Sequence, residues 1–130
     1  MSERNHLWRA RARFAFEAVE NWGSWKKDAT QRVKGLPVQL RTQGLPVTIA
    51  TLLREDKVNT RELAHLIARW VMDEAPHKPL PKQKPQAKDL LEACIRADRA
   101  SYMAAQTEAL SLLEQVKLFA DALHGTKGDT

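Results

Sequence analysis

Apolar residues recur every three or four positions along nearly the whole chain, the spacing that gathers them on one face of an α-helix. Segments that alternate apolar and polar residues between turns, as β-strands do, are almost absent. We therefore expect an all-α protein, with helices over residues 3–22, 25–34, 37–43, 46–55, 60–75, 86–98 and 100–123. The length of 130 residues suits one domain with a real core. We predict a single-domain bundle of about six helices over residues 1–125 and a frayed polar tail over 126–130.

The apolar positions also predict which residues form the core. In segment 100–123 they step four, three, four, three and four residues, a seam that packs against other helices at a shallow angle. The residues expected on inner helix faces are Leu7, Ala10, Phe14, Ala18, Leu63, Leu66, Ile67, Trp70, Val71, Leu90, Leu91, Cys94, Ile95, Ala105, Ala109, Leu112, Val116, Phe119 and Leu123. Two helix starts carry capping signals, Ser24 before the second helix and Asn59 with Glu62 before the helix over 60–75.

The stretch 36–53 predicts a short helix, a stop at Gly44 and an immediate second helix. Pro37 and Pro46 stand in the first turn of each helix, where the missing N–H has no partner to lose. Gly44 stands where a positive φ is wanted. A helix end and a helix start beside Arg41 would suit an anion such as phosphate. The alternative, favoured by how common such junctions are, is a helix–helix corner that only packs.

Residues 76–85 contain four prolines and three lysines. Proline at this density excludes a helix, so we expect an extended, mobile loop after a helix that ends at Pro76. The sequence leaves open whether this Pro/Lys-rich loop contacts a partner or has no role.

The formal net charge of +5 is unevenly placed along the chain. Residues 1–54 contain ten Lys and Arg against four Asp and Glu, a balance of +6. Residues 55–130 contain eleven against twelve, a balance of −1. A basic half on a small domain indicates a polyanionic partner, of which nucleic acid is the commonest, and ordinary solubility charge is the alternative.

Ten basic side chains are candidates for contact with a nucleic-acid phosphate backbone, because they lie on predicted outer helix faces or around the second helix. They are Arg9, Arg13, Lys26, Lys27, Arg32, Lys34, Arg41, Arg61, His65 and Arg69. Such residues suit phosphates and carry no base-specific readout, and for any one of them a solvated surface position is the alternative. Of the tryptophans, Trp22 and Trp70 lie on predicted core faces. For Trp8 and Trp25 the sequence leaves open whether the ring packs against the core or stacks on bases.

No catalytic or metal-binding group of residues can be assembled from the sequence, so we expect no enzyme, no catalytic residue, no cofactor and no metal site. His6, His65, His77 and His124 lack a His or Cys partner at metal-ligand spacing. The single cysteine, Cys94, excludes an internal disulfide and is predicted to be buried. No apolar run approaches the roughly 20 residues of a membrane span, and the N-terminus lacks the apolar core of a signal peptide. We expect a cytoplasmic protein.

Several features, taken in their order along the chain, resemble those of a known family. They are the first-helix segment 11–20, the restart at Leu36–Pro37, the turn 41–45 before an apolar helix, and the final helical stretch 98–123. Over about residues 10–123 the chain resembles the small α-helical subunit of the Cmr complex, the type III-B CRISPR RNA-guided effector of antiviral defence.

The resemblance implies an all-α bundle without an active site of its own. It implies that copies stack head to tail along the effector, with a basic face lining the channel for the guide–target duplex. The implied partners are the other Cmr subunits, further copies of this chain and, through the assembled complex, guide RNA and target RNA, whereas target cleavage belongs to other subunits. The alternative is a helical protein–protein adaptor with no nucleic-acid contact.

Overall fold

The computed structural model describes residues 3–125, and over these residues it contains seven α-helices, one π-helical turn and no strand. The elements are α1 (Glu3–Glu20), α2 (Lys26–Val33), α3 (Leu36–Gln43), α4 (Leu45–Glu55), α5 (Val58–Arg69), η1 (Trp70–Glu74), α6 (Ala87–Arg96) and α7 (Arg99–His124). The all-α, single-domain prediction is confirmed. The tail predicted over 126–130 lies outside the described residues.

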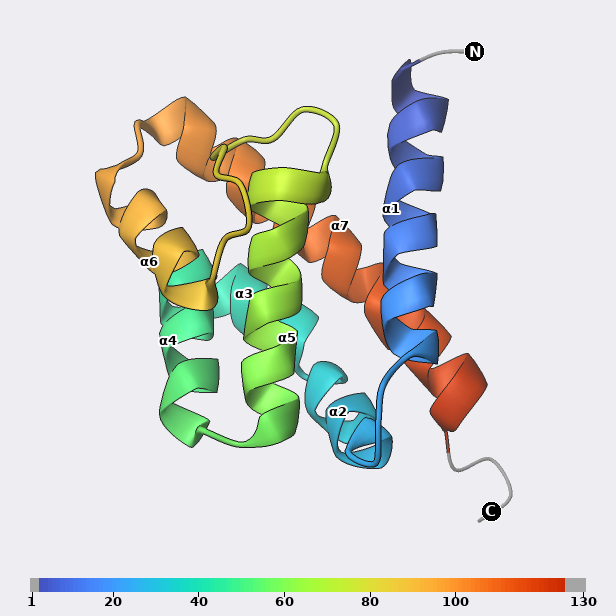
Figure 1. The fold of residues 1–130 in the computed structure, drawn as a ribbon. Coiled ribbons are helices and arrows are strands. Elements are labelled where there is room, and N and C mark those ends of the chain that lie inside the picture. Colours follow the sequence, from blue (N-terminus) through green and yellow to red (C-terminus); the bar gives the residue numbers. More distant parts are fainter. Residues whose placement is uncertain (1–2, 126–130) are drawn as a thin grey trace.

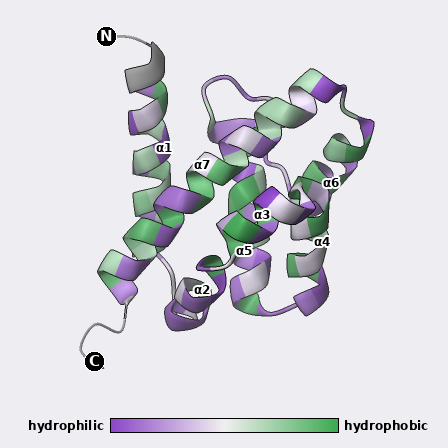
Figure 2. Cartoon of the chain, turned by 180° about the vertical axis from the view of Figure 1, so that it is seen from behind, coloured by the Kyte–Doolittle hydropathy of each residue, from purple (hydrophilic) through white to green (hydrophobic). Residues whose placement is uncertain are grey.

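The long helix α7 packs against α1, α2, α3, α5 and η1. Figure 1 shows α5 standing between α4 and α1, with α7 running diagonally behind them. The view from behind shows α3 against α7, and α1 beside the C-terminal half of α7 (Figure 2). The core that these contacts enclose is continuous from Val19 of α1 through Leu63 and Trp70 to Leu112 of α7. A second side of the core is made by α4 and α6, which pack on each other and on α5.

The corner between α3 and α4 forms as the sequence predicts. Gly44 has φ +88°, in the region that glycine adopts without steric cost, and Pro37 and Pro46 both lie in the first turn of their helices. A side chain of α7 links the two helices. The amide of Gln106 donates to the Leu40 carbonyl over 3.4 Å, and its oxygen accepts from the Leu45 N–H over 3.0 Å. The corner is therefore held by α7.

Two capping predictions are wrong. Helix α5 begins at Val58, two residues earlier than expected, and its first turn is closed by Thr60, whose hydroxyl accepts from the Lys57 N–H at 3.0 Å. Asn59 is buried instead of capping. Helix α2 begins at Lys26 and has no side-chain cap, so Ser24 does not serve it.

Most of the predicted core is buried, but several predicted positions are only half-buried against it: Leu7, Ala10, Phe14, Ala18, Leu91 and Phe119. Trp70, Leu90 and Leu112 are fully or almost fully buried, as is Cys94, whereas Ile95 is 72% exposed. Helix α6 lies at the edge of the bundle, so only one narrow face of it meets α4 and α5. Leu123, on the last turn of α7, is likewise exposed, because α7 there extends beyond most of its neighbours.

The Pro/Lys-rich loop is non-helical, as expected, but several contacts fasten it to the bundle. Its Leu80 is buried in the core, the Lys82 N–H donates to the Met72 carbonyl at 2.9 Å, and the Lys84 N–H donates to Asp73 at 3.2 Å. The prediction of a non-helical segment is therefore confirmed. The path is not extended throughout, because it turns at Lys78 (φ 36°) and Lys84 (φ 47°), and the contacts oppose the predicted mobility.

Candidate nucleic-acid interface

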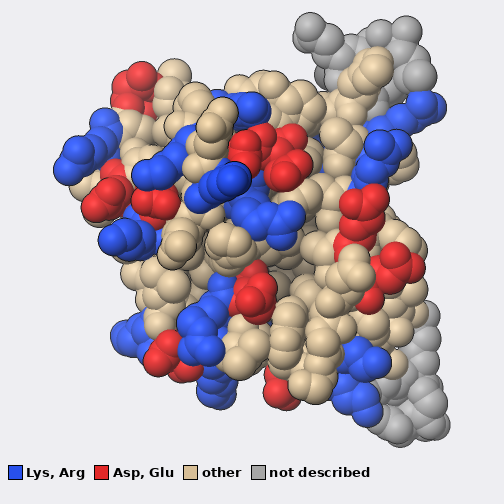
Figure 3. All heavy atoms as spheres, in the orientation of Figure 1, with Lys and Arg blue, Asp and Glu red and all other residues tan. Residues whose placement is uncertain are grey.

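The ten candidate cations do not share one surface. His65 and Arg69 border a cleft between α1 and α5, whereas Lys34 and Arg41 border a larger groove between α3, α1 and the end of α7. On the face that carries the cleft, Lys and Arg side chains alternate with Asp and Glu side chains, so no single-sign patch covers it (Figure 3). This face therefore lacks the continuous positively charged surface that is typical of nucleic-acid-binding proteins.

Three candidates are held in ion pairs. Arg32 donates to both carboxylate oxygens of Glu55, at 2.9 and 2.8 Å, and this hydrogen bond lowers the pKa of Glu55 against the opposing effect of burial. Arg61 donates to Asp56 at 2.7 Å in an exposed pair. Such an exposed pair is worth about 0–1 kcal/mol, so a phosphate can replace the carboxylate at small cost.

Arg41 is the third, and it pairs with Glu114 of α7 in an exposed pair. The N–H of Leu45, the first residue of α4, donates to the side-chain oxygen of Gln106. The amide at the corner is therefore occupied by α7, as in a packing junction. The Arg41–Glu114 pair, like that of Arg61, can open to a phosphate at small cost.

The remaining candidates have exposed side chains, except for half-buried His65. They are Arg9, Arg13, Lys26, Lys27, Lys34, His65 and Arg69. None of them has an ion pair among the residues that the structure describes. Arg69 lies over the ring of Phe14, with its guanidinium carbon 5.1 Å from the ring centroid, a cation–π arrangement.

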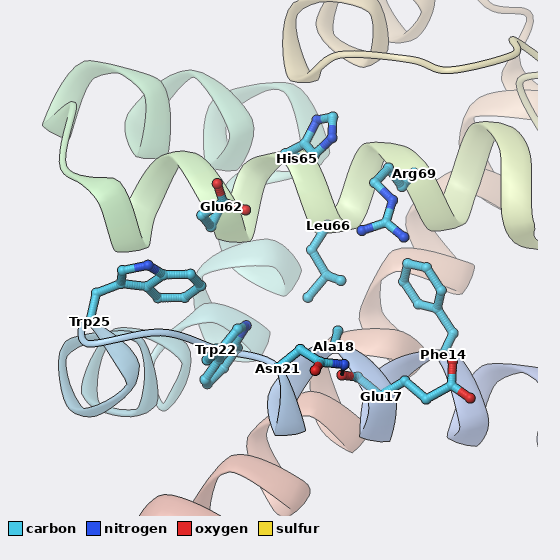
Figure 4. Close-up of a pocket in the computed structure, with 10 residues that line it drawn as sticks. All are labelled: Phe14, Glu17, Ala18, Asn21, Trp22, Trp25, Glu62, His65, Leu66 and Arg69. Atoms are coloured by element: carbon cyan, nitrogen blue, oxygen red, sulfur yellow. Dashed lines mark hydrogen bonds between the residues drawn. The ribbon is translucent and has the colours of Figure 1, made fainter.

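The cleft between α1 and α5 is lined by both helices and by the connection from α1 to α2. It has a volume of about 290 Å³. Trp22 and Trp25 lie at one end, with ring centroids 5.8 Å apart, and Phe14 lies beneath Arg69 at the other (Figure 4). Leu66 points into the space between them. The cleft exists because α1 packs on α7 while α5 packs on α2 and α4, so the two facing helices are not in close contact.

Sequence reasoning missed a buried polar network centred on Glu108 of α7. Its carboxylate is 4% exposed and accepts from Arg11 of α1 through Nε at 2.7 Å and Nη2 at 3.1 Å. The indole N–H of Trp70 donates to it at 2.7 Å, and His77 Nε2 of the Pro/Lys-rich loop lies 3.5 Å away. The missed signal is spacing, because Glu108 follows Ala105 by three residues and so lies on the seam of α7.

Two features of the described residues bear on function. No group of three or more His, Cys, Asp or Glu side chains in residues 3–125 is placed to hold a metal ion. None of the helices that the structure describes combines the length and the apolar character needed to span a bilayer.

The fold and its surface define a small all-helical protein with basic side chains distributed over several faces. The family model described as CRISPR-associated protein (Cas_Cmr5) matches residues 7–123, so this chain belongs to that family. It is a small helical subunit of the type III-B Cmr complex, with other Cmr subunits as partners.

One solved structure supports the fold in detail. It is the crystal structure of a CRISPR-associated Cmr5 family protein from Thermus thermophilus, which matches with a TM-score of 0.72 at 24% sequence identity. The match covers 88% of this chain and 95% of that chain. No curated protein is significantly similar to the chain in sequence.

Proposed function

We propose that this chain is a non-catalytic structural subunit of the Cmr ribonucleoprotein effector in antiviral defence. In this role copies of it stack along the guide–target RNA duplex and contact its phosphate backbone. The family match over residues 7–123 is the observation that carries the proposal. Sequence choice is left to base pairing with the guide, as in other RNA-guided systems.

Exposed cations supply the backbone contact. Arg9 and Arg13 lie one turn apart on α1, and Lys26 and Lys27 form the first turn of α2. Their side chains are exposed, so they meet a phosphate without first breaking an ion pair within the described part of the chain. Each phosphate contact releases counterions, which makes the binding dependent on salt and independent of sequence.

Charge reversal in the assembled effector tests this contact. The variants Arg9→Glu with Arg13→Glu, and Lys26→Glu with Lys27→Glu, should weaken target capture. They should also reduce the slope of log Kd against log salt concentration by about one for each lost contact. The matched control reverses Arg96 and the neighbouring Arg99, which are exposed and outside the candidate set.

Two results would contradict the assignment. One is unchanged affinity and salt slope in both candidate variants while the effector still assembles. The other is an equal loss in the control, which would show that only the net charge of the subunit matters.

The second candidate function, a protein–protein adaptor, is favoured by the groove of about 1060 Å³ on the other side of α1. Its lining includes Trp8, Val38 and Leu118, three large apolar side chains that are each more than half exposed. Exposed apolar side chains gathered in one groove are typical of contacts between proteins. Capture of the other Cmr subunits by the tagged chain, with and without RNase, separates the two functions, because an adaptor retains every partner after RNA is removed.

A further inference from the structure

The cleft between α1 and α5 contains ionisable side chains that the fold does not use. Glu17 from α1, and Glu62 and Arg69 from α5, border it, and none of these side chains has a hydrogen-bond or ion-pair partner within the described residues. Figure 4 shows Glu62 and Arg69 on the same side of the cleft and Glu17 on the opposite side. Two carboxylates and a guanidinium are thus available to a ligand.

The walls of the cleft favour a flat, aromatic ligand. Trp22 and Trp25 supply two indole faces at one end, and Leu66 supplies an apolar surface between them and Phe14. Stacking on an indole depends only on the ring face of the ligand.

The polar rim sets a further condition on the ligand. A carboxylate only accepts hydrogen bonds and a guanidinium only donates them, so a ligand that satisfies both has donors on one edge and acceptors on another. An aliphatic amine or a guanidinium offers donors alone and would meet the positive charge of Arg69. A simple anion offers acceptors alone and would meet the carboxylates of Glu17 and Glu62.

We propose that this cleft binds one unpaired guanine base of the RNA that the subunit contacts. The proposal rests on the proposed function. Guanine carries N–H donors on its Watson–Crick edge, which suit the Glu62 carboxylate, and the O6 and N7 acceptors that guanidinium groups recognise. Glu62 and Arg69 are seven residues apart on α5, about 10.5 Å along the helix axis, which leaves room for one base between them. Only an unpaired guanine has its donor edge free.

Two lysines adjoin the aromatic end of the cleft. Lys26 and Lys27 follow Trp25 directly and are exposed. A nucleotide whose base stacks on Trp25 therefore has cations within reach of its own or its neighbouring phosphates. This arrangement joins the sequence-independent contact to a single base-specific position.

The test uses the isolated full chain with guanosine monophosphate as the probe, followed by NMR of the indole N–H signals. We expect the signals of Trp22 and Trp25 to shift on addition of this nucleotide, and the signal of buried Trp70 to stay in place. Adenosine and cytidine monophosphates should bind at least about tenfold more weakly, because each offers one amino group to the carboxylate, whereas guanine offers the adjacent N1–H and N2–H₂ donors and the paired O6 and N7 acceptors. A tenfold change corresponds to about 1.4 kcal/mol.

Two variants examine the two parts of the site. Glu62→Gln keeps the shape of an exposed side chain but removes the carboxylate. It should weaken the binding of guanosine monophosphate about tenfold. Glu92→Gln on α6 is the matched control, with the same change of charge at an exposed position away from the cleft, and it should have no effect. Trp25→Ala should weaken the binding of the nucleotide by a similar factor, because stacking on the indole is lost. Trp25→Phe should retain part of the affinity that Trp25→Ala loses.

A duplex RNA arm distinguishes failure of the cleft from failure of the proposed function. The assembled effector should bind a duplex with one unpaired guanosine more tightly than it binds the fully paired duplex. The variant Glu62→Gln should remove that difference in affinity. The same variant should leave binding of the paired duplex unchanged or slightly tighter, since it removes a negative charge near the phosphates. Absence of any Trp22 or Trp25 shift, or equal shifts with all three nucleotides, overturns the guanine site. Guanine-dependent shifts with no duplex binding would instead refute the backbone contact and retain the cleft.

Discussion

Removal of the Glu108 charge should destabilise the protein more than any surface change. The carboxylate is almost fully buried and neutralises Arg11, whose own side chain is 13% exposed. The variant Glu108→Gln keeps the volume and an acceptor for the Trp70 indole N–H, and it removes the charge together with the second oxygen, which accepts from Arg11 Nη2. The guanidinium of Arg11 is then left without its counter-charge between α1 and α7.

The magnitude follows from the burial of the pair. Breaking a buried ion pair by removing one partner costs about 3–5 kcal/mol. The lower end applies here, about 3 kcal/mol, because Arg11 retains some access to water. For a domain of this length that corresponds to a fall in Tm of about 10 °C. Glu108→Ala should cost about 1–3 kcal/mol more, since the Trp70 N–H also loses its acceptor.

Urea unfolding monitored by tryptophan fluorescence measures these differences. The matched control is the double variant Arg11→Met with Glu108→Gln, in which neither charge is left uncompensated. It should recover much of the stability that Glu108→Gln loses. A Glu108→Gln cost below about 0.5 kcal/mol would refute the reasoning. So would a double variant whose cost equals the sum of the two single costs, since that sum would show that the charges do not interact.

Three further predictions concern the corner, acid stability and the cysteine. Gly44→Ala should lower the free energy of unfolding in urea by about 1–3 kcal/mol, because alanine is strained at the positive φ of this position. The control Gly35→Ala, at φ −93° with open space around the Cα, should be neutral or stabilising. Equal effects of the two changes would contradict backbone strain at Gly44. Arg32 lowers the pKa of Glu55, so the stability from this pair is present above the ordinary glutamate pKa of about 4.3 and is lost as the pH falls through the lowered value. Glu55→Gln should therefore flatten the acid side of the stability curve, and an unchanged curve would count against the pair. Burial raises the pKa of Cys94 to about 11, so a thiol reagent at mildly alkaline pH should label it only after unfolding, and rapid labelling of the folded chain would disprove its burial.

The corner between α3 and α4 shows how far local signals reach. Gly44 and the two prolines specify a positive φ and two helix starts through their own backbone chemistry, which does not depend on the rest of the chain. The same segment also suggested an anion site at Arg41, where the structure places an amide and a guanidinium that already have partners. The partners that occupy the corner, Gln106 and Glu114, come from a helix more than 60 residues further along the chain.

The candidate cations illustrate the same limit. A helical wheel correctly places Arg61 and Arg69 outside the core, yet it says nothing of which cations already have a carboxylate partner. Glu108 was detectable in principle as a charge on an apolar seam, but its partners Arg11 and Trp70 meet it only when three elements pack.

Helical periodicity and turn residues are local properties, so the order of residues was sufficient to establish an all-α bundle, nearly all of its helices and the break at Gly44. The pairing of cations, the buried Glu108 network and the aromatic cleft depend on distances between residues far apart in the chain. Those distances follow from where α1, α5 and α7 rest against one another, and only the packed structure contains that information.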